Sequence, residues 1–164
     1  PGPMSLLSPS LSGLCSLTNL DLSYCNLKAI PSDVGCLFFL KKLNLSGNHF
    51  GCLPKSISQL SNLIILRVEN CKNLQLLPKP PLNICYIWGY GCTSLETVPD
   101  LLKLNSLGNR ALLLSNCSKL VDKQRFIHLF FALIRKQPRV SLSLLLSSKQ
   151  HVWYISGTLS SQQI

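Results

Sequence analysis

The stretch LKKLNLSGNHF at residues 40–50 places leucines at its first, fourth and sixth positions, followed by an asparagine and a further apolar residue. The same spacing precedes it in LTNLDLSYCNL (17–27) and follows it in LIILRVENCKNL (63–74), where Val68 replaces the third leucine. The equal steps from Leu20 to Leu43 and from Leu43 to Leu66 indicate an internal repeat with a period of about 23 residues. The L-x-L centre of each unit predicts a short strand with its leucines on one face, because alternate side chains of a strand point the same way.

These strands are expected to pair with one another, because a single unit of this length cannot bury its leucines alone. Stacked units close a continuous core and align their strands in parallel, the architecture of the leucine-rich repeat. The sequence therefore predicts an α/β solenoid, a horseshoe fragment with a parallel concave sheet, over residues 1–121 in about five units. A fourth unit is slightly shorter and a fifth is degraded, and their apolar anchors are Ile84, Ile87, Cys92, Leu95, Val98, Leu112, Leu114, Cys117 and Leu120.

The ninth position of the pattern holds asparagine or cysteine, where the chain turns inward after the strand. Asn48 is suited to bond the backbone groups at this turn, whereas a thiol bonds weakly but packs well. Further along, Pro31 and Pro54 precede segments 32–36 and 55–59, each of which is predicted to form one helical turn. Four cysteines occupy the slot of Asn48 in other units and are expected to be small buried thiols: Cys25, Cys71, Cys92 and Cys117.

The cysteine count allows two interpretations of the compartment. Eight is an even number, so a secreted protein could pair its cysteines in disulfides. The recurrence of four cysteines at one repeat position favours a reduced, intracellular protein. No two cysteines form a C-x-x-C pair and the three histidines are scattered, so no metal site is expected. Because no catalytic set of serine, histidine and carboxylate is recognisable, we interpret the chain as a binding module without cofactor and not as an enzyme.

The net charge of +10 is concentrated in the second part of the sequence. Residues 1–100 hold seven basic and five acidic side chains, whereas residues 101–164 hold nine and one. A solvated surface explains such a tail, and an acidic partner or a phosphate is the alternative. No nucleic-acid binding is expected, because aromatic residues do not interleave with these charges. The longest apolar run, 126–134, is shorter than the roughly 20 residues of a membrane span.

Residues 122–164 are expected to form a separate segment after the repeats. A largely apolar helix is predicted over 123–136 and ends before Pro138. Only 140–146 and 152–155 have the composition of strands beyond it.

Several repeat phrases resemble one family. LDLSYCNL (20–27), LNLSGN (43–48), VENCKNL (68–74) and GCTSLETVP (91–99) are similar to the repeats of plant intracellular immune receptors, most closely the TIR-type nucleotide-binding class. KPPL (79–82) resembles the proline-rich stretch near the end of such arrays. The L-x-G-x-I-P phrase of extracellular receptor kinases is not sustained here.

The resemblance implies a module that senses a pathogen effector or restrains the receptor's own nucleotide-binding domain, in the cytoplasm or the nucleus. The sequence has no G-x-x-x-x-G-K-[ST] loop, so nucleotide chemistry would belong to domains outside it. The tail is shorter than the β-sandwich expected after such repeats, which suggests truncation or divergence. The alternative is an extracellular repeat protein that binds a secreted enzyme or peptide.

The candidate binding residues are the strand positions that are not leucine, since these face outward from the core in columns across the units. Tyr, Trp and Arg often dominate interface energy, so the fourth strand and its neighbour form the predicted contact patch. The alternative is that these aromatic rings pack under the post-repeat segment. The predicted protein-binding residues are Asp21, Asn44, Arg67, Glu69, Tyr86, Trp88 and Tyr90.

Overall fold

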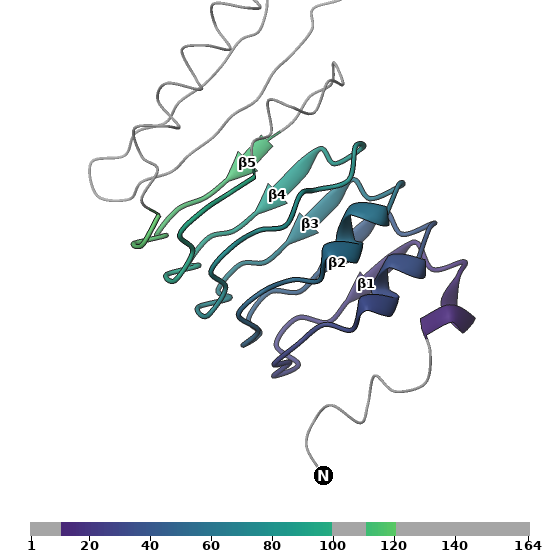
Figure 1. Cartoon of the computed structure of the whole chain (residues 1–164), viewed down its shortest axis with the longest axis horizontal. Coiled ribbons are helices and arrows are strands. Elements are labelled where there is room, and N and C mark those ends of the chain that lie inside the picture. The colour runs from purple at the N-terminus through teal and green to yellow at the C-terminus, as the bar shows by residue number, and fades with distance from the viewer. Residues whose placement is uncertain (1–10, 100–110, 121–164) are drawn as a thin grey trace, which may run out of the picture.

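Each repeat contributes one three-residue strand to a single parallel sheet (Figure 1). The computed structural model describes residues 11–99 and 111–120, and within them the strands follow one another in chain order across the sheet. The predicted solenoid with a parallel sheet is therefore confirmed. The strands are β1 (Asn19–Asp21), β2 (Lys42–Asn44), β3 (Ile65–Arg67), β4 (Tyr86–Trp88) and β5 (Ala111–Leu113).

The register of the sheet stacks equivalent repeat positions on one another. Leu20 pairs with Leu43, Leu43 with Leu66, and Ile87 follows in the same column before Leu112. Leu43, Leu66, Ile87 and Leu112 are all buried, as are the predicted anchors of the degraded fifth unit. Burying one such side chain stabilises the fold by about 1.5–3 kcal/mol, so the column forms a continuous core that no single unit could supply.

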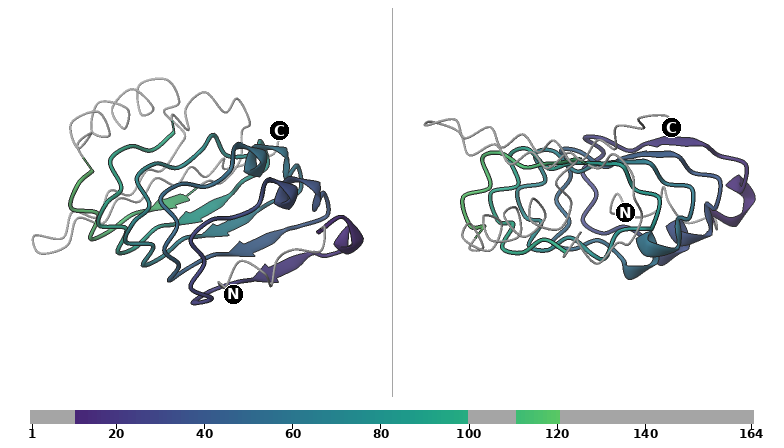
Figure 2. Two further views of the ribbon diagram at one scale, coloured as in Figure 1. Left: turned by 60° about the horizontal axis from the view of Figure 1, so that its bottom comes forward. Right: turned by 90° about the horizontal axis from the view of Figure 1, so that it is seen from above.

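Short helical turns return the chain behind the sheet in the first three units (Figure 2). These 3₁₀ turns are η2 (Leu11–Leu14), η3 (Ser32–Cys36) and η4 (Lys55–Gln59). The bounds of the second and third turns are those predicted, and each follows a proline in extended conformation. Gly35 allows η4 to lie close against η3, since a Cβ at Gly35 would come within 2.7 Å of the Cβ of Ser56.

The first unit departs from the prediction. Cys25 is exposed, although the repeat pattern predicted a buried thiol, and Leu14 is exposed at the position where Leu37 and Leu60 are buried. Among the described residues no unit packs on the outer side of β1, so the inward positions of this unit are covered on one side only.

The predicted post-repeat segment, 122–164, lies outside the described residues, and so do its helix 123–136 and the strands 140–146 and 152–155. Within residues 11–99 and 111–120, no helix is both long enough and apolar enough to cross a bilayer.

Candidate functional site

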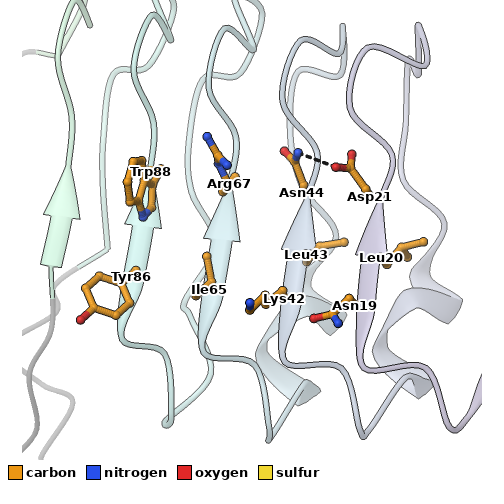
Figure 3. Close-up of a pocket in the computed structure, with 10 residues that line it drawn as sticks. All are labelled: Asn19, Leu20, Asp21, Lys42, Leu43, Asn44, Ile65, Arg67, Tyr86 and Trp88. Atoms are coloured by element: carbon orange, nitrogen blue, oxygen red, sulfur yellow. Dashed lines mark hydrogen bonds between the residues drawn. The ribbon is translucent and has the colours of Figure 1, made fainter.

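The outward side chains of the strands form the rows that the repeat predicts. Asp21, Asn44, Arg67 and Trp88 lie in one row, because each is the direct partner of the next in the sheet register (Figure 3). Tyr86 lies in a parallel row with Asn19, Lys42 and Ile65. We call this outer surface of the sheet, with the residues that directly follow the strands, the concave face. Strands β1 to β4 line an open groove of about 500 Å³ on this face.

The β1 end of the concave face is polar and already hydrogen-bonded. The Ser23 hydroxyl and backbone amide donate to Asp21 Oδ1 at 2.6 and 2.9 Å, and Asn44 Nδ2 donates to Asp21 Oδ2 at 3.0 Å. These donors, Ser23 first, hold the pKa of the Asp21 carboxyl below its ordinary value, because they favour the charged form. Asp21 is therefore a carboxylate at neutral pH.

Arg67, at the centre of the face, is fixed by two contacts. Its Nε and Nη2 donate to Glu69 Oε2 at 2.9 and 2.6 Å, and its guanidinium carbon lies 5.2 Å from the centre of the Trp88 ring. An exposed ion pair contributes only about 0–1 kcal/mol to stability, so the effect of these contacts is mainly to orient the groups. The guanidinium and the indole present one preformed surface, which lowers the entropy lost on binding.

The aromatic end of the face follows at β4. Tyr86, Trp88 and Tyr90 are 37%, 39% and 42% exposed, although large aromatic side chains are usually more buried. Gly89 lies between Trp88 and Tyr90 at an inward position, and a Cβ there would come within 2.6 Å of Leu114 Cδ2. The side chain of Leu114 thus fills the space that a side chain at position 89 would occupy.

The structure brings together all seven predicted binding residues. Asp21, Asn44, Arg67, Tyr86 and Trp88 lie on strands, whereas Glu69 and Tyr90 follow theirs by two positions. The sequence analysis missed the ion pair of Arg67 with Glu69 and the cation–π contact of Arg67 with Trp88. The spacing of Arg67 and Glu69 could have indicated the ion pair, since residues i and i+2 of an extended chain lie on the same face. The alternative, that these rings pack under the post-repeat segment, involves residues 122–164, which lie outside the described residues.

The turn after each strand is held by the asparagine or cysteine slot. Asn48 Nδ2 donates to the carbonyls of Leu22 and Leu45, both at 2.8 Å, and its Oδ1 accepts from the Leu27 amide at 2.9 Å. The buried thiols donate to one carbonyl from the preceding unit each: Cys71 to Leu45 at 3.3 Å, Cys92 to Val68 at 3.0 Å and Cys117 to Gly89 at 3.2 Å. The predicted roles of Asn48 and of these three cysteines are confirmed.

Burial changes the acidity of these thiols. It raises the pKa of Cys92 to about 12, with the neighbouring Cys117 and Cys71 adding to the effect, and that of Cys117 to about 11. A buried thiol with so high a pKa stays protonated at neutral pH and is therefore a poor nucleophile. In the described part of the chain, no three His, Cys, Asp or Glu side chains gather as they would around a metal ion.

The residue before this slot has a positive φ in every described unit. Gly47 and Gly91 have φ values of 69° and 73°, and Asn70 and Asn116 have values of 57° and 54°. Glycine and asparagine tolerate this left-handed conformation better than other residues. Tyr24 adopts it at 55° in the first unit, and its ring lies against Gly47, with its hydroxyl 3.4 Å from Asn70 Nδ2.

Comparisons with known proteins agree with this geometry. The family model described as Leucine Rich Repeat matches residues 16–37 and 39–60. The disease resistance-like protein DSC1 of Arabidopsis thaliana is 40% identical over 120 residues, which are 71% of this chain and 10% of that protein. The chain is a leucine-rich-repeat segment of the plant disease resistance class.

Two further relatives support this assignment. The TMV resistance protein N of Nicotiana glutinosa is 48% identical over 75 residues, 44% of this chain and 7% of that protein. The disease resistance protein RPP2B of Arabidopsis thaliana is 35% identical over 117 residues, 70% of this chain and 10% of that protein. The resemblance to TIR-type nucleotide-binding receptors is confirmed, and the extracellular alternative is not favoured. The segment spans about a tenth of the length of such resistance proteins.

Proposed function

We propose that this leucine-rich-repeat segment is a sensing or autoinhibitory module of a plant immune receptor, and that its concave face binds a protein. The observation that carries the proposal is the exposed cluster of Arg67, Trp88, Tyr86 and Tyr90, in which Glu69 orients the guanidinium beside the indole. These residue types contribute most of the energy of many protein interfaces. Binding, and not catalysis, is the activity proposed for the chain.

Two protein partners fit the proposal. One is a pathogen effector, and the other is the nucleotide-binding domain of the same receptor. Both place the module in the cytoplasm or the nucleus, where thiols stay reduced. The buried thiols of Cys71, Cys92 and Cys117 support this compartment, because each serves the fold as a hydrogen-bond donor.

Replacing Trp88 by alanine in the full receptor tests the proposal. Loss of a central interface tryptophan costs about 2 kcal/mol or more of binding free energy, which weakens affinity about thirtyfold. If the face holds the nucleotide-binding domain, the variant receptor will trigger a defence response in leaf tissue without a pathogen. If it senses an effector, the variant will lose the response to that effector.

The matched control is Leu76→Ala, which removes a similarly exposed apolar side chain away from the sheet rows. This control should respond as the unchanged receptor does. The proposal is wrong if Trp88→Ala leaves both kinds of response unchanged while lowering the unfolding midpoint of the purified segment, because the ring would then serve packing alone.

A further inference from the structure

A second group of exposed apolar side chains lies apart from the concave face. The segments that lead into β1, β2, β3 and β4 carry it, and we call it the lateral patch. Phe38 and Phe39 are 53% and 60% exposed, and Leu82 is 63% exposed. The remaining members of the patch are Leu14 and Ile64.

Backbone hydrogen bonds place these segments side by side. The Ile64 amide donates to the Lys41 carbonyl at 2.9 Å, and the Cys85 amide donates to the Ile64 carbonyl at 2.8 Å. Adjacent strands of a sheet are about 4.8 Å apart, so apolar side chains on successive units are close enough for one partner to touch several of them. The lateral patch therefore runs along one edge of the solenoid, with polar side chains between its apolar members.

The repeat position of Phe39 is occupied by asparagine in the next two units, where its side chain stabilises the stacking of units. There, Asn62 Nδ2 donates to the Phe38 carbonyl and Asn83 Nδ2 to the Ser61 carbonyl, both at 2.7 Å, and each bond ties a unit to the preceding one. Phe39 presents an exposed ring instead of such an amide. Two adjacent, largely exposed phenylalanines contribute little to folding, and large exposed apolar patches commonly mark interaction surfaces.

The charge around the patch indicates the partner's chemistry. Lys41 is exposed, and the described stretches 14–18, 37–42, 60–65 and 81–86 contain no Asp or Glu. Charge complementarity favours carboxylates on a partner that also offers apolar side chains. We propose that the lateral patch binds an acidic, amphipathic segment of a protein, at a surface separate from the concave face.

A protein fits this edge better than a lipid surface does. Ser61, Asn62 and Asn83 lie between the apolar side chains and are exposed, so a covering layer has to offer them hydrogen-bond partners. A protein interface supplies such partners, whereas the acyl region of a membrane does not.

The test uses the full chain and a fluorescein-labelled synthetic helical peptide of about 14 residues, with leucines on one face and glutamates on the other. Fluorescence anisotropy should show saturable binding. Replacing both Phe38 and Phe39 by serine should weaken it at least about tenfold, as should changing the peptide's glutamates to lysines. Lys41→Glu should weaken binding of the acidic peptide as well.

Leu76→Ser is the matched control, because it removes an exposed apolar side chain elsewhere, and it should leave peptide binding unchanged. Trp88→Ala should also leave it unchanged, so a failure here is distinguishable from a failure of the concave-face proposal. Four results would overturn the inference. They are no binding of the acidic peptide, equal binding by the double Phe variant, binding only to vesicles of anionic lipid, and a self-association of the chain that the double variant abolishes.

Discussion

Replacing Asn48 by alanine should destabilise the solenoid more than most single substitutions, because its buried side chain ties together two neighbouring units. The amide bonds the carbonyls of Leu22 and Leu45 and the amide of Leu27. After the change, the Leu45 carbonyl keeps the Cys71 thiol as a donor at 3.3 Å. The carbonyl of Leu22 and the amide of Leu27 have no other partner among the described residues.

A buried group left without a partner costs about 1–3 kcal/mol. The Leu27 amide is buried and the Leu22 carbonyl is partly buried, so the two together lower the free energy of unfolding by about 3 kcal/mol. With a urea dependence of about 2 kcal/mol/M, the unfolding midpoint falls by about 1.5 M. Urea titration followed by circular dichroism measures this shift.

Asn48→Cys is the informative comparison, because three other units carry a buried cysteine in this slot. A thiol at position 48 can donate to the Leu22 carbonyl as Cys71 does to Leu45, but it leaves the Leu27 amide without its acceptor. The loss should therefore be about half that of the alanine variant, about 1.5 kcal/mol. An alanine variant as stable as the unchanged chain, or a cysteine variant as unstable as the alanine one, would refute the role assigned to these bonds.

Two further perturbations follow from the core. Gly89→Val should destabilise the chain by about 1–3 kcal/mol in the same urea titration, since its side chain would displace Leu114, whereas Gly13→Val should change little because nothing lies within 4 Å of a Cβ there. Burial raises the pKa of Cys92 from 9.0 to about 12, so the folded state favours the protonated thiol. The protonated thiol therefore contributes its full share to the free energy of unfolding below pH 9, and this contribution is lost as the pH rises toward 12. Thermal unfolding midpoints measured between pH 8 and 11 should fall with rising pH, and less steeply in Cys92→Ala; equal slopes would contradict the assignment.

Much of the fold could be predicted because one period fixes both the strand register and the turns between strands. The pairing of Leu43 with Leu66 and the bounds of the helical turn at 55–59 follow from stepping one period along the chain from the preceding unit. Features that depend on a particular neighbour could not be predicted in this way. The exposure of Cys25 reflects the absence of a covering unit among the described residues, and the space at Gly89 is filled by Leu114, which belongs to the following unit.

The candidate site shows the same division. The rows of outward residues follow from strand alternation, which is why Asp21, Asn44 and Arg67 could be placed together. The cation–π contact of Arg67 with Trp88 depends on side-chain rotamers, which no repeat pattern specifies. The lateral patch was missed because Phe38 and Phe39 lie between the consensus leucines, where the pattern carries no information about exposure.

The left-handed turn after each strand has a consequence for how such a protein can change. The chain turns through the left-handed backbone conformation of Gly47, Asn70, Gly91 and Asn116. The buried leucines stabilise the stack of units. Neither the turns nor the core therefore depends on the residues at the outward strand positions. Mutation can therefore alter the surface chemistry of the sheet, residue by residue, with little loss of the scaffold. The residues that determine the surface of the sheet and the residues that hold the fold together are thus separate sets, so the surface can change while the architecture stays constant.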